Sequence, residues 1–140
     1  MKRMFLQGEH GAAVVEFAII ATLLFTFVFG IIEFGILMFD KHVLTNASRE
    51  GARAGVVMRN TRVTDAEIRN IVNDYAQAHL VSFGPSTLTT NVRPVGPRSG
   101  ASLFGTQLEV SVTYPYNFLF LSSLGLGPIT LTAETRMRME

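Results

Sequence analysis

The longest apolar stretch of the chain lies near its N-terminal end and predicts a membrane-spanning helix. Residues 12–39 read AAVVEFAIIATLLFTFVFGIIEFGILMF, with no charged side chain between Phe17 and Ile32. A transmembrane helix needs about 20 mostly apolar residues to cross a hydrocarbon core of about 30 Å. The rest of the chain is too short to bury a helix that is apolar on every side. A signal peptide would have a shorter apolar region, about 7–15 residues, and then a small-residue cleavage site.

Beyond the apolar stretch the sequence still favours a helix, which we expect to continue through residues 40–60 and to end near Met58. No proline occurs before Pro85. Small residues that are spaced by four share one face of this extension: Ala47, Gly51 and Gly55. Small residues at this spacing allow two backbones to approach closely. The partner is either the chain's own domain or another subunit.

The pattern of residues 61–140 predicts a small α+β domain. Thr64 and Glu67 stand at capping-box spacing and open a second amphipathic helix that ends near Val81. The period then changes to two, which predicts strands over residues 88–95, 108–114 and 129–139. We expect a three-stranded antiparallel sheet, packed on the second helix and on the upper part of the first, with Pro94 at an edge or a strand end.

An apolar loop separates the last two predicted strands. Residues 117–127 read NFLFLSSLGLG, and the most apolar positions are Phe118 to Leu121 and Leu124. An exposed apolar loop usually marks a contact with protein or membrane. The alternative is that this loop folds over the open end of the sheet.

Composition excludes several classes of function. The 140 residues contain 12 Lys and Arg against 11 Asp and Glu, so no basic surplus exists for binding nucleic acid. Without cysteine there is no disulfide, no thiol nucleophile and no thiolate metal site. The three histidines are scattered, and neither a nucleophile–base pair nor a phosphate-binding loop is recognisable. We therefore expect no enzyme, no cofactor, no metal and no small-molecule substrate.

Two carboxylates, Glu16 and Glu33, lie within the apolar stretch. An ionisable side chain inside a spanning helix costs about 2.5–3.5 kcal/mol on insertion scales, so it usually has a partner or a task. For Glu33, near the far end of the span, we expect an interfacial carboxylate that faces headgroups or water; Lys41 of a neighbouring subunit is the other candidate partner. Glu16 either reaches the nearer interface or has a specific role.

The residues around Glu16 resemble the processing site of type IV prepilins and pseudopilins. Gly11 is followed by four apolar residues, then by Glu16 and Phe17, and the preceding residues 1–11 include Lys2 and Arg3. The resemblance implies cleavage between Gly11 and Ala12 by a prepilin peptidase, with the leader in the cytoplasm. The ammonium group freed on Ala12 could then pair with Glu16 of a neighbouring subunit and fix the register between subunits.

Three motifs make this resemblance more specific. GAAVVEFA at 11–18, IIEFG at 31–35 and NASREGAR at 46–53 resemble the pattern of TadE-like proteins, which are minor pilins or pseudopilins of the tight-adherence (Tad) pilus system. The last motif carries three charges: Arg49, Glu50 and Arg53. The likeness is close over the first 58 residues and holds only in outline beyond them.

The TadE-like resemblance implies a type IV pilin-like protein of the bacterial inner membrane, surrounded by lipid, with its domain periplasmic or extracellular. Its expected partners are the prepilin peptidase, other Tad pilins and the inner-membrane assembly platform. The implied role is pilus assembly, adhesion or associated secretion, as a filament component, a tip initiator or a retained assembly factor.

The predicted organisation is a leader (1–11), a transmembrane helix (12–39), its extension (40–60) and a domain (61–140). An unprocessed single-pass anchor that presents a small extracytoplasmic binding domain is the alternative function. Such an anchor needs neither Gly11 nor Glu16, so these two residues separate the two hypotheses.

Overall fold

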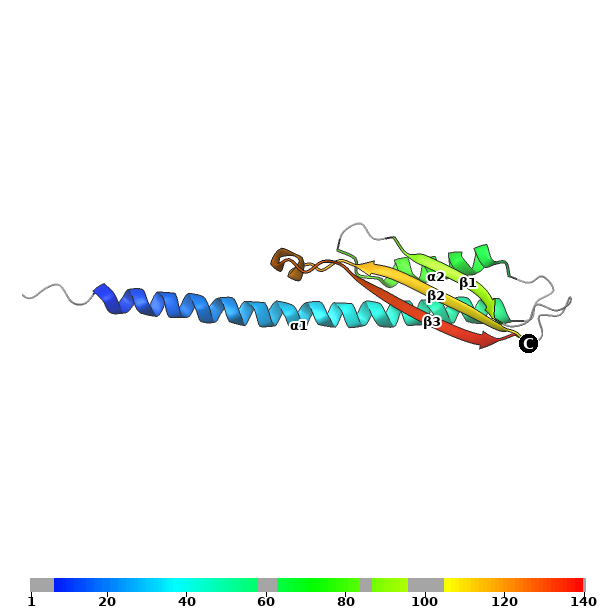
Figure 1. Cartoon of the computed structure of the whole chain (residues 1–140), viewed down its shortest axis with the longest axis horizontal. Helices are drawn as coiled ribbons and strands as arrows, with labels where there is room; N and C mark the ends of the chain where they lie inside the picture. The colour runs from blue at the N-terminus through cyan, green and yellow to red at the C-terminus, as the bar shows by residue number, and fades with distance from the viewer. Residues whose placement is uncertain (1–6, 58–62, 84–86, 96–104, 140) are drawn as a thin grey trace, which may run out of the picture.

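The computed structural model describes residues 7–57, 63–83, 87–95 and 105–139. It confirms the predicted α+β class, with a long apolar helix, a second helix and a three-stranded antiparallel sheet (Figure 1). The elements are α1 (Gln7–Val56), α2 (Asp65–His79), β1 (Thr89–Val95), β2 (Gln107–Tyr116), the short 3₁₀ helix η1 (Leu121–Leu124) and β3 (Ile129–Arg138). The predicted ends of the helices and strands are correct to within about two residues, except that α1 begins at Gln7, five residues before the predicted start at Ala12. The short helix η1 was not predicted.

Helix α1 extends along the whole molecule, and only its C-terminal half is covered by the domain (Figure 1). Its N-terminal half exposes large apolar side chains in all directions, such as Phe17 at 72% and Ile31 at 71% exposure. Among the described residues, α1 is the one helix long and apolar enough to cross a membrane, and its most apolar window is not buried at all. The predicted membrane helix and its extension form one continuous helix.

The covered half of α1 has a continuous buried face. Buried positions recur at intervals of three and four, which keeps them on one side of a helix with 3.6 residues per turn. This face includes Glu33, Leu37, Asp40, Leu44, Ala47, Ser48, Gly51, Ala52 and Gly55. Apolar, small and polar residues therefore share the surface that meets the domain.

The capping box predicted for α2 is confirmed. The Thr64 side chain accepts a hydrogen bond from the Glu67 backbone N–H (3.2 Å), and the Thr64 backbone N–H donates to the Glu67 carboxylate (2.7 Å). This reciprocal pair satisfies N–H groups that the first turn of a helix leaves open. The buried face of α2 consists of Ile68, Val72 and Ala76.

The sheet has the order β1-β2-β3, and both pairs are antiparallel. Alternate residues of β2 are buried, Val110 and Val112 completely, and they join the core formed with α1 and α2. Strand β1 contacts α2, while β2 and β3 contact α1. Pro94 lies in β1, an edge strand, as predicted, where a missing N–H is tolerated.

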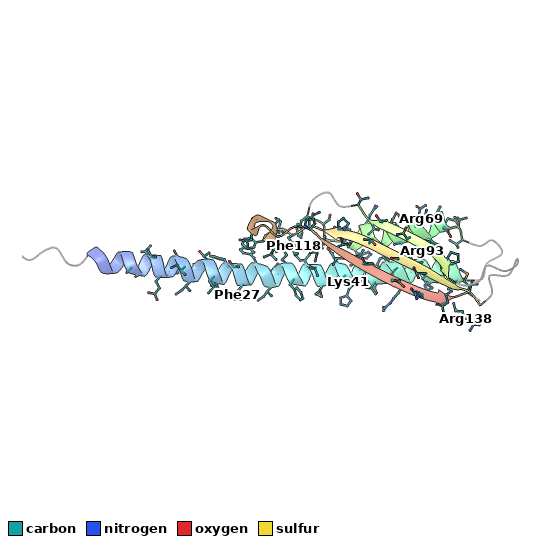
Figure 2. The ribbon with its side chains drawn as sticks, in the orientation of Figure 1. Phe27, Lys41, Arg69, Arg93, Phe118 and Arg138 are labelled. Carbon is teal, nitrogen blue, oxygen red and sulfur yellow. The ribbon has the colours of Figure 1, made fainter. Side chains whose placement is uncertain are left out.

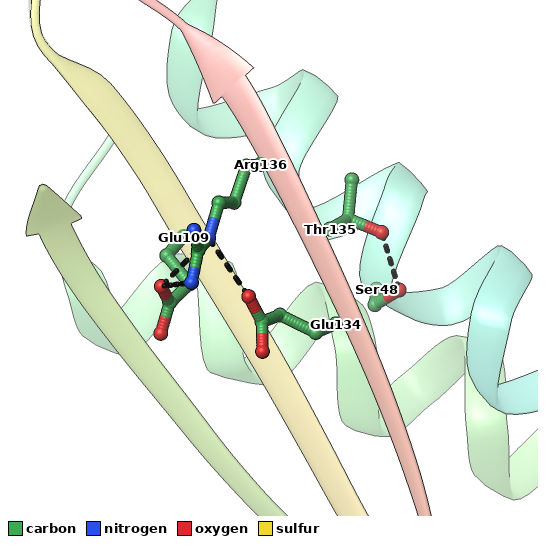
Figure 3. Close-up of polar contacts among 5 residues, drawn as sticks. All are labelled: Ser48, Glu109, Glu134, Thr135 and Arg136. Atoms are coloured by element: carbon green, nitrogen blue, oxygen red, sulfur yellow. Dashed lines mark hydrogen bonds and ion pairs between the residues drawn. The ribbon is translucent and has the colours of Figure 1, made fainter.

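The two faces of β3 make different polar contacts (Figure 3). On the exposed face, Arg136 binds Glu109 of β2 (3.0 Å) and Glu134 of its own strand (2.8 Å). On the face toward α1, the hydroxyls of Ser48 and Thr135 are 2.7 Å apart. Exposed ion pairs contribute little, roughly 0–1 kcal/mol each, so the sheet depends mainly on its apolar face.

Candidate functional site

The predicted processing site lies in the second turn of α1. Gly11 is helical, and a Cβ atom added to it would meet nothing within 4 Å. Residues 1–6 of the predicted leader lie outside the described part of the chain, as do the side chains of residues 7–10. Glycine costs about 1 kcal/mol more than alanine inside a helix, so this turn unwinds into an extended form more readily than a turn with alanine here would.

One turn further, Glu16 and Phe17 are both exposed on the uncovered part of α1. Within the described residues, nothing forms a hydrogen bond or ion pair with the Glu16 carboxylate. Its neighbours Val14 and Val15 are exposed and apolar, at 67% and 60%. A carboxylate in such surroundings is costly unless a group from outside the chain pairs with it.

The small-residue face of α1 packs against the chain's own domain. Ala47 is fully buried, and Gly51 and Gly55 are buried with it. A Cβ on Gly51 would overlap Cγ2 of Val72, and one on Gly55 would lie 2.7 Å from Cδ1 of Ile68. Val72 and Ile68 belong to α2, and a Cβ on Gly55 would also overlap Cδ2 of Leu108 in β2. These glycines therefore allow α1 to pack closely on both α2 and the sheet.

We predict that Gly51→Leu destabilises the domain by about 1–3 kcal/mol, the typical cost of overpacking a core. The new side chain has to displace Val72, whose branched Cβ leaves it little rotamer freedom. Gly35→Leu is the matched control, because a Cβ at Gly35 meets nothing within 4 Å. Urea denaturation of both full-length variants in detergent micelles, followed by circular dichroism, measures the difference. Equal stability of the two variants would contradict this packing role.

The charged residues of the third motif lie on the outer side of α1. Arg53 donates two hydrogen bonds to Glu50, at 2.7 and 3.1 Å, and the two side chains are 67% and 40% exposed. Arg49 is exposed as well. An i,i+3 pair of this kind stabilises a helix by only roughly 0.2–0.5 kcal/mol. The three side chains therefore contribute little to stability and make the outer surface of α1 charged.

The expectation for Glu33 was wrong. Its side chain is only 3% exposed and binds the domain of its own chain, not headgroups, water or a neighbouring subunit. The carboxylate accepts hydrogen bonds from three successive backbone N–H groups, those of Leu119, Phe120 (3.1 Å) and Leu121 (2.9 Å). Lys41 is engaged elsewhere, because its ammonium group donates to the carbonyl of Thr132 in β3.

Glu33 thereby holds the η1 loop (residues 117–127) against α1. The ring of Phe120 stacks on Phe29 of α1 at a centroid distance of 4.7 Å, and Phe118 packs edge-on against Tyr116 at 5.5 Å. Figure 2 shows Phe118 beside α1, where the loop leaves the sheet. Each of the two interpretations of this loop therefore holds for part of it. Phe118 packs on the core at the end of β2, whereas Leu119, Leu124 and Leu126 stay exposed beside α1.

Two further polar residues of α1 attach the domain, and sequence reasoning did not single them out. Asp40 is fully buried, and its Oδ1 accepts a hydrogen bond from the backbone N–H of Val81 (3.0 Å), just after α2. Ser48, also fully buried, pairs with Thr135. Their spacing was the available signal: Glu33, Asp40 and Ser48 are separated by seven and eight residues, two helical turns each.

The hydroxyl of Tyr116 lies in the same region as these carboxylates. It is fully buried and has no hydrogen-bond partner among the described residues. Burial above all, together with the negative charges of Glu33 and Asp40, raises the pKa of Tyr116 to about 12. The phenol therefore stays neutral in the folded protein at a pH where an unfolded chain, with a pKa near 10, has begun to ionise.

We predict that Tyr116→Phe changes the free energy of unfolding by less than about 1 kcal/mol at neutral pH, because no protein hydrogen bond is lost. Above about pH 10 the folded protein keeps a proton that the unfolded chain releases, so stability falls as pH rises. The variant lacks this loss, and its advantage should grow by up to about 1.4 kcal/mol per pH unit up to about pH 12. Urea denaturation at neutral and alkaline pH measures both effects. Parallel pH profiles for the two proteins would contradict the raised pKa.

The contacts described for α1 and the domain are apolar packing, hydrogen bonds and ion pairs. In the described ranges, no three His, Asp or Glu side chains gather closely enough to hold a metal ion. The candidate functional residues lie along one helix: Gly11 and Glu16 on its bare half, and Glu33 and the small-residue face on its covered half.

Comparison with known protein families identifies the family that the sequence of α1 matches. The family described as TadE-like protein matches residues 11–53. This segment is TadE-like. Comparison with curated proteins gives no match, and comparison with solved structures gives none either. The match confirms the resemblance inferred from the three motifs.

The TadE-like segment begins at Gly11 and ends at Arg53, so it lies entirely within α1. It includes the bare apolar half, Glu16, Glu33 and the contact of Gly51 with α2. The match implies a protein associated with the Tad pilus, and it suggests interaction with other pilus components. The α1 helix, long and apolar enough to span a membrane, is consistent with a membrane-anchored pilin.

Proposed function

We propose that the chain is a minor pilin or pseudopilin of a Tad-type pilus, and that a prepilin peptidase cleaves it between Gly11 and Ala12. The proposal rests on the TadE-like match, which begins at the glycine of the processing motif. On the exposed apolar helix that follows, Glu16 has no partner among the described residues. An anchor for a binding domain requires only the apolar helix.

Cleavage would place an ammonium group on Ala12, one helical turn from Glu16. In a bundle of such helices, the ammonium of one subunit can pair with the carboxylate of its neighbour. The attraction between the Ala12 ammonium and the Glu16 carboxylate then offsets the free-energy cost of removing both charges from water. Parallel helices paired in this way are displaced along their axis by four residues, about 6 Å. The pair thus selects one axial register, which apolar side chains such as Phe17 would not fix alone.

The rest of the bare helix supplies the apolar surface of that bundle, or its contact with lipid before assembly. The leader faces the cytoplasm of a bacterial inner membrane, and the domain lies on the opposite side. The role is structural, in pilus assembly, and the partners are the peptidase, other Tad pilins and the assembly platform.

A variant that resists processing tests this function. In its native cell, Gly11→Leu as the only copy should remain uncleaved in the membrane, and piliation should be lost or strongly reduced. Val15→Leu is the matched control, because it changes an exposed apolar residue in the same segment and keeps both Gly11 and Glu16. Normal piliation by uncleaved Gly11→Leu would overturn the proposal.

A further inference from the structure

The η1 loop lies at the level of the apolar span of α1, well before the helix reaches its first basic residue after the span. A hydrocarbon core of about 30 Å takes about 20 helical residues. Counted from Phe17, twenty residues extend to Ile36. Phe29, which stacks on Phe120 of the loop, is seven residues before that boundary, or about 10 Å deeper.

The surface of the loop is as apolar as the helix beside it. No charged residue occurs from Val110 to Ala133, a stretch that contains the whole loop. The outward-facing side chains are large and aliphatic: Leu119 is 59% exposed, Leu124 is 57% and Leu126 is 51%. They continue the exposed apolar surface of the bare half of α1.

Many backbone N–H groups of the loop are hydrogen-bonded within the protein, as a segment in hydrocarbon requires. Irregular backbone is rarely found in hydrocarbon because each unpaired N–H or C=O costs several kcal/mol there. Here six N–H groups have partners within the chain. Glu33 accepts from residues 119, 120 and 121, and carbonyls within the loop accept from residues 123, 125 and 126 at 3.1–3.2 Å.

The two serines of the loop are satisfied in the same way. Ser122 and Ser123 donate their hydroxyls to the carbonyls of Leu119 (3.3 Å) and Phe120 (2.6 Å). Both serines are exposed, but their hydroxyls are hydrogen-bonded within the loop. Polar groups that are bonded internally, beside leucines that face outward, are the arrangement expected of a segment surrounded by lipid. A water-exposed loop would leave its polar groups to the solvent and bury its leucines.

From these observations we propose that the η1 loop is a second membrane-contacting element, which inserts into the leaflet on the domain's side and packs its leucines against lipid acyl chains. Glu33 is the residue that makes the insertion possible, since it satisfies the N–H groups of residues 119–121 at that depth. The domain is therefore held to the bilayer at two points, α1 and the loop. This inference does not require cleavage at Gly11.

Site-specific fluorescence tests the insertion directly, because the chain contains no tryptophan. Full-length Leu124→Trp is reconstituted in phosphatidylcholine vesicles whose acyl chains carry bromine, a contact quencher. Leu24→Trp, exposed on α1, reports the bilayer interior, and Gln107→Trp, exposed at the opposite end of the sheet from the loop, reports water. Leu126→Trp is a second loop variant in case the first misfolds.

We expect Leu124→Trp to show a blue-shifted emission and a loss of fluorescence comparable with that of Leu24→Trp, while Gln107→Trp is unaffected by brominated lipid. Emission like that of Gln107→Trp would place the loop in water and overturn the inference. A blue-shifted emission that brominated lipid does not quench would also overturn it, because protein rather than lipid would then cover the loop.

Discussion

Glu33→Ala is expected to detach the η1 loop from α1 and to lower the free energy of unfolding by about 3 kcal/mol or more. The substitution removes the acceptor of three backbone N–H groups at a site only 3% exposed. Each buried donor left without a partner costs about 1–3 kcal/mol. The loss of the loop also frees the ring of Phe120 from its stacking on Phe29.

Hydrogen exchange gives this prediction a local readout. In detergent micelles, the amides of residues 119–121 should be protected in the original protein and should exchange much faster in Glu33→Ala. Glu50→Ala is the matched control, because it removes a carboxylate of the same helix that is 40% exposed and contributes only a surface ion pair. Unchanged protection of these three amides in Glu33→Ala would show that Glu33 does not hold the loop.

Glu16→Ala is expected to leave the protein inserted and folded but unable to join filaments. The side chain is exposed on the bare half of α1 and forms no hydrogen bond or ion pair with the described residues of the domain, so the fold does not depend on it. Within a helical bundle, however, the ammonium of the neighbouring Ala12 would be buried without its partner. Breaking a buried pair in this way costs about 3–5 kcal/mol, which corresponds to a loss of roughly a hundredfold or more in incorporation.

Glu16→Gln separates charge from shape in that experiment. It has nearly the same size as glutamate and no charge, so it should fail almost as completely as alanine. The measurement is the amount of the chain in sheared pili relative to the membrane fraction, with each variant as the only copy. Normal incorporation of Glu16→Gln would contradict the pairing with Ala12, whatever the result for alanine.

The elements of this fold were predictable because each has a strong local pattern. The apolar run of α1, the Thr64–Glu67 capping box and the alternation in β2 depend only on residues close together in sequence. The glycines at 51 and 55 could likewise be assigned to a packing face, since spacing by four places them together. Their partners, α2 and Leu108 of β2, were left open because spacing on one helix says nothing about what covers it.

The role of Glu33 could not be deduced in the same way. Its partners are 86–88 residues away in the sequence, and they are backbone N–H groups, which have no residue-specific signature. A carboxylate near the end of an apolar helix is therefore interpreted as interfacial by default. The heptad-like spacing of Glu33, Asp40 and Ser48 on the face of Leu37 and Leu44 was the clue that these polar groups face the domain.

The N-terminus of the protein in its native membrane tests most directly whether the chain is a processed pilin-like subunit, as we propose. The measurement is the intact mass and N-terminal sequence of the protein from its native membrane, with and without the prepilin peptidase. We predict a chain that begins at Ala12 only when the peptidase is present. A chain that still begins at Met1 in both samples would contradict the account and would favour an unprocessed anchor, in which Glu16 has no pairing role.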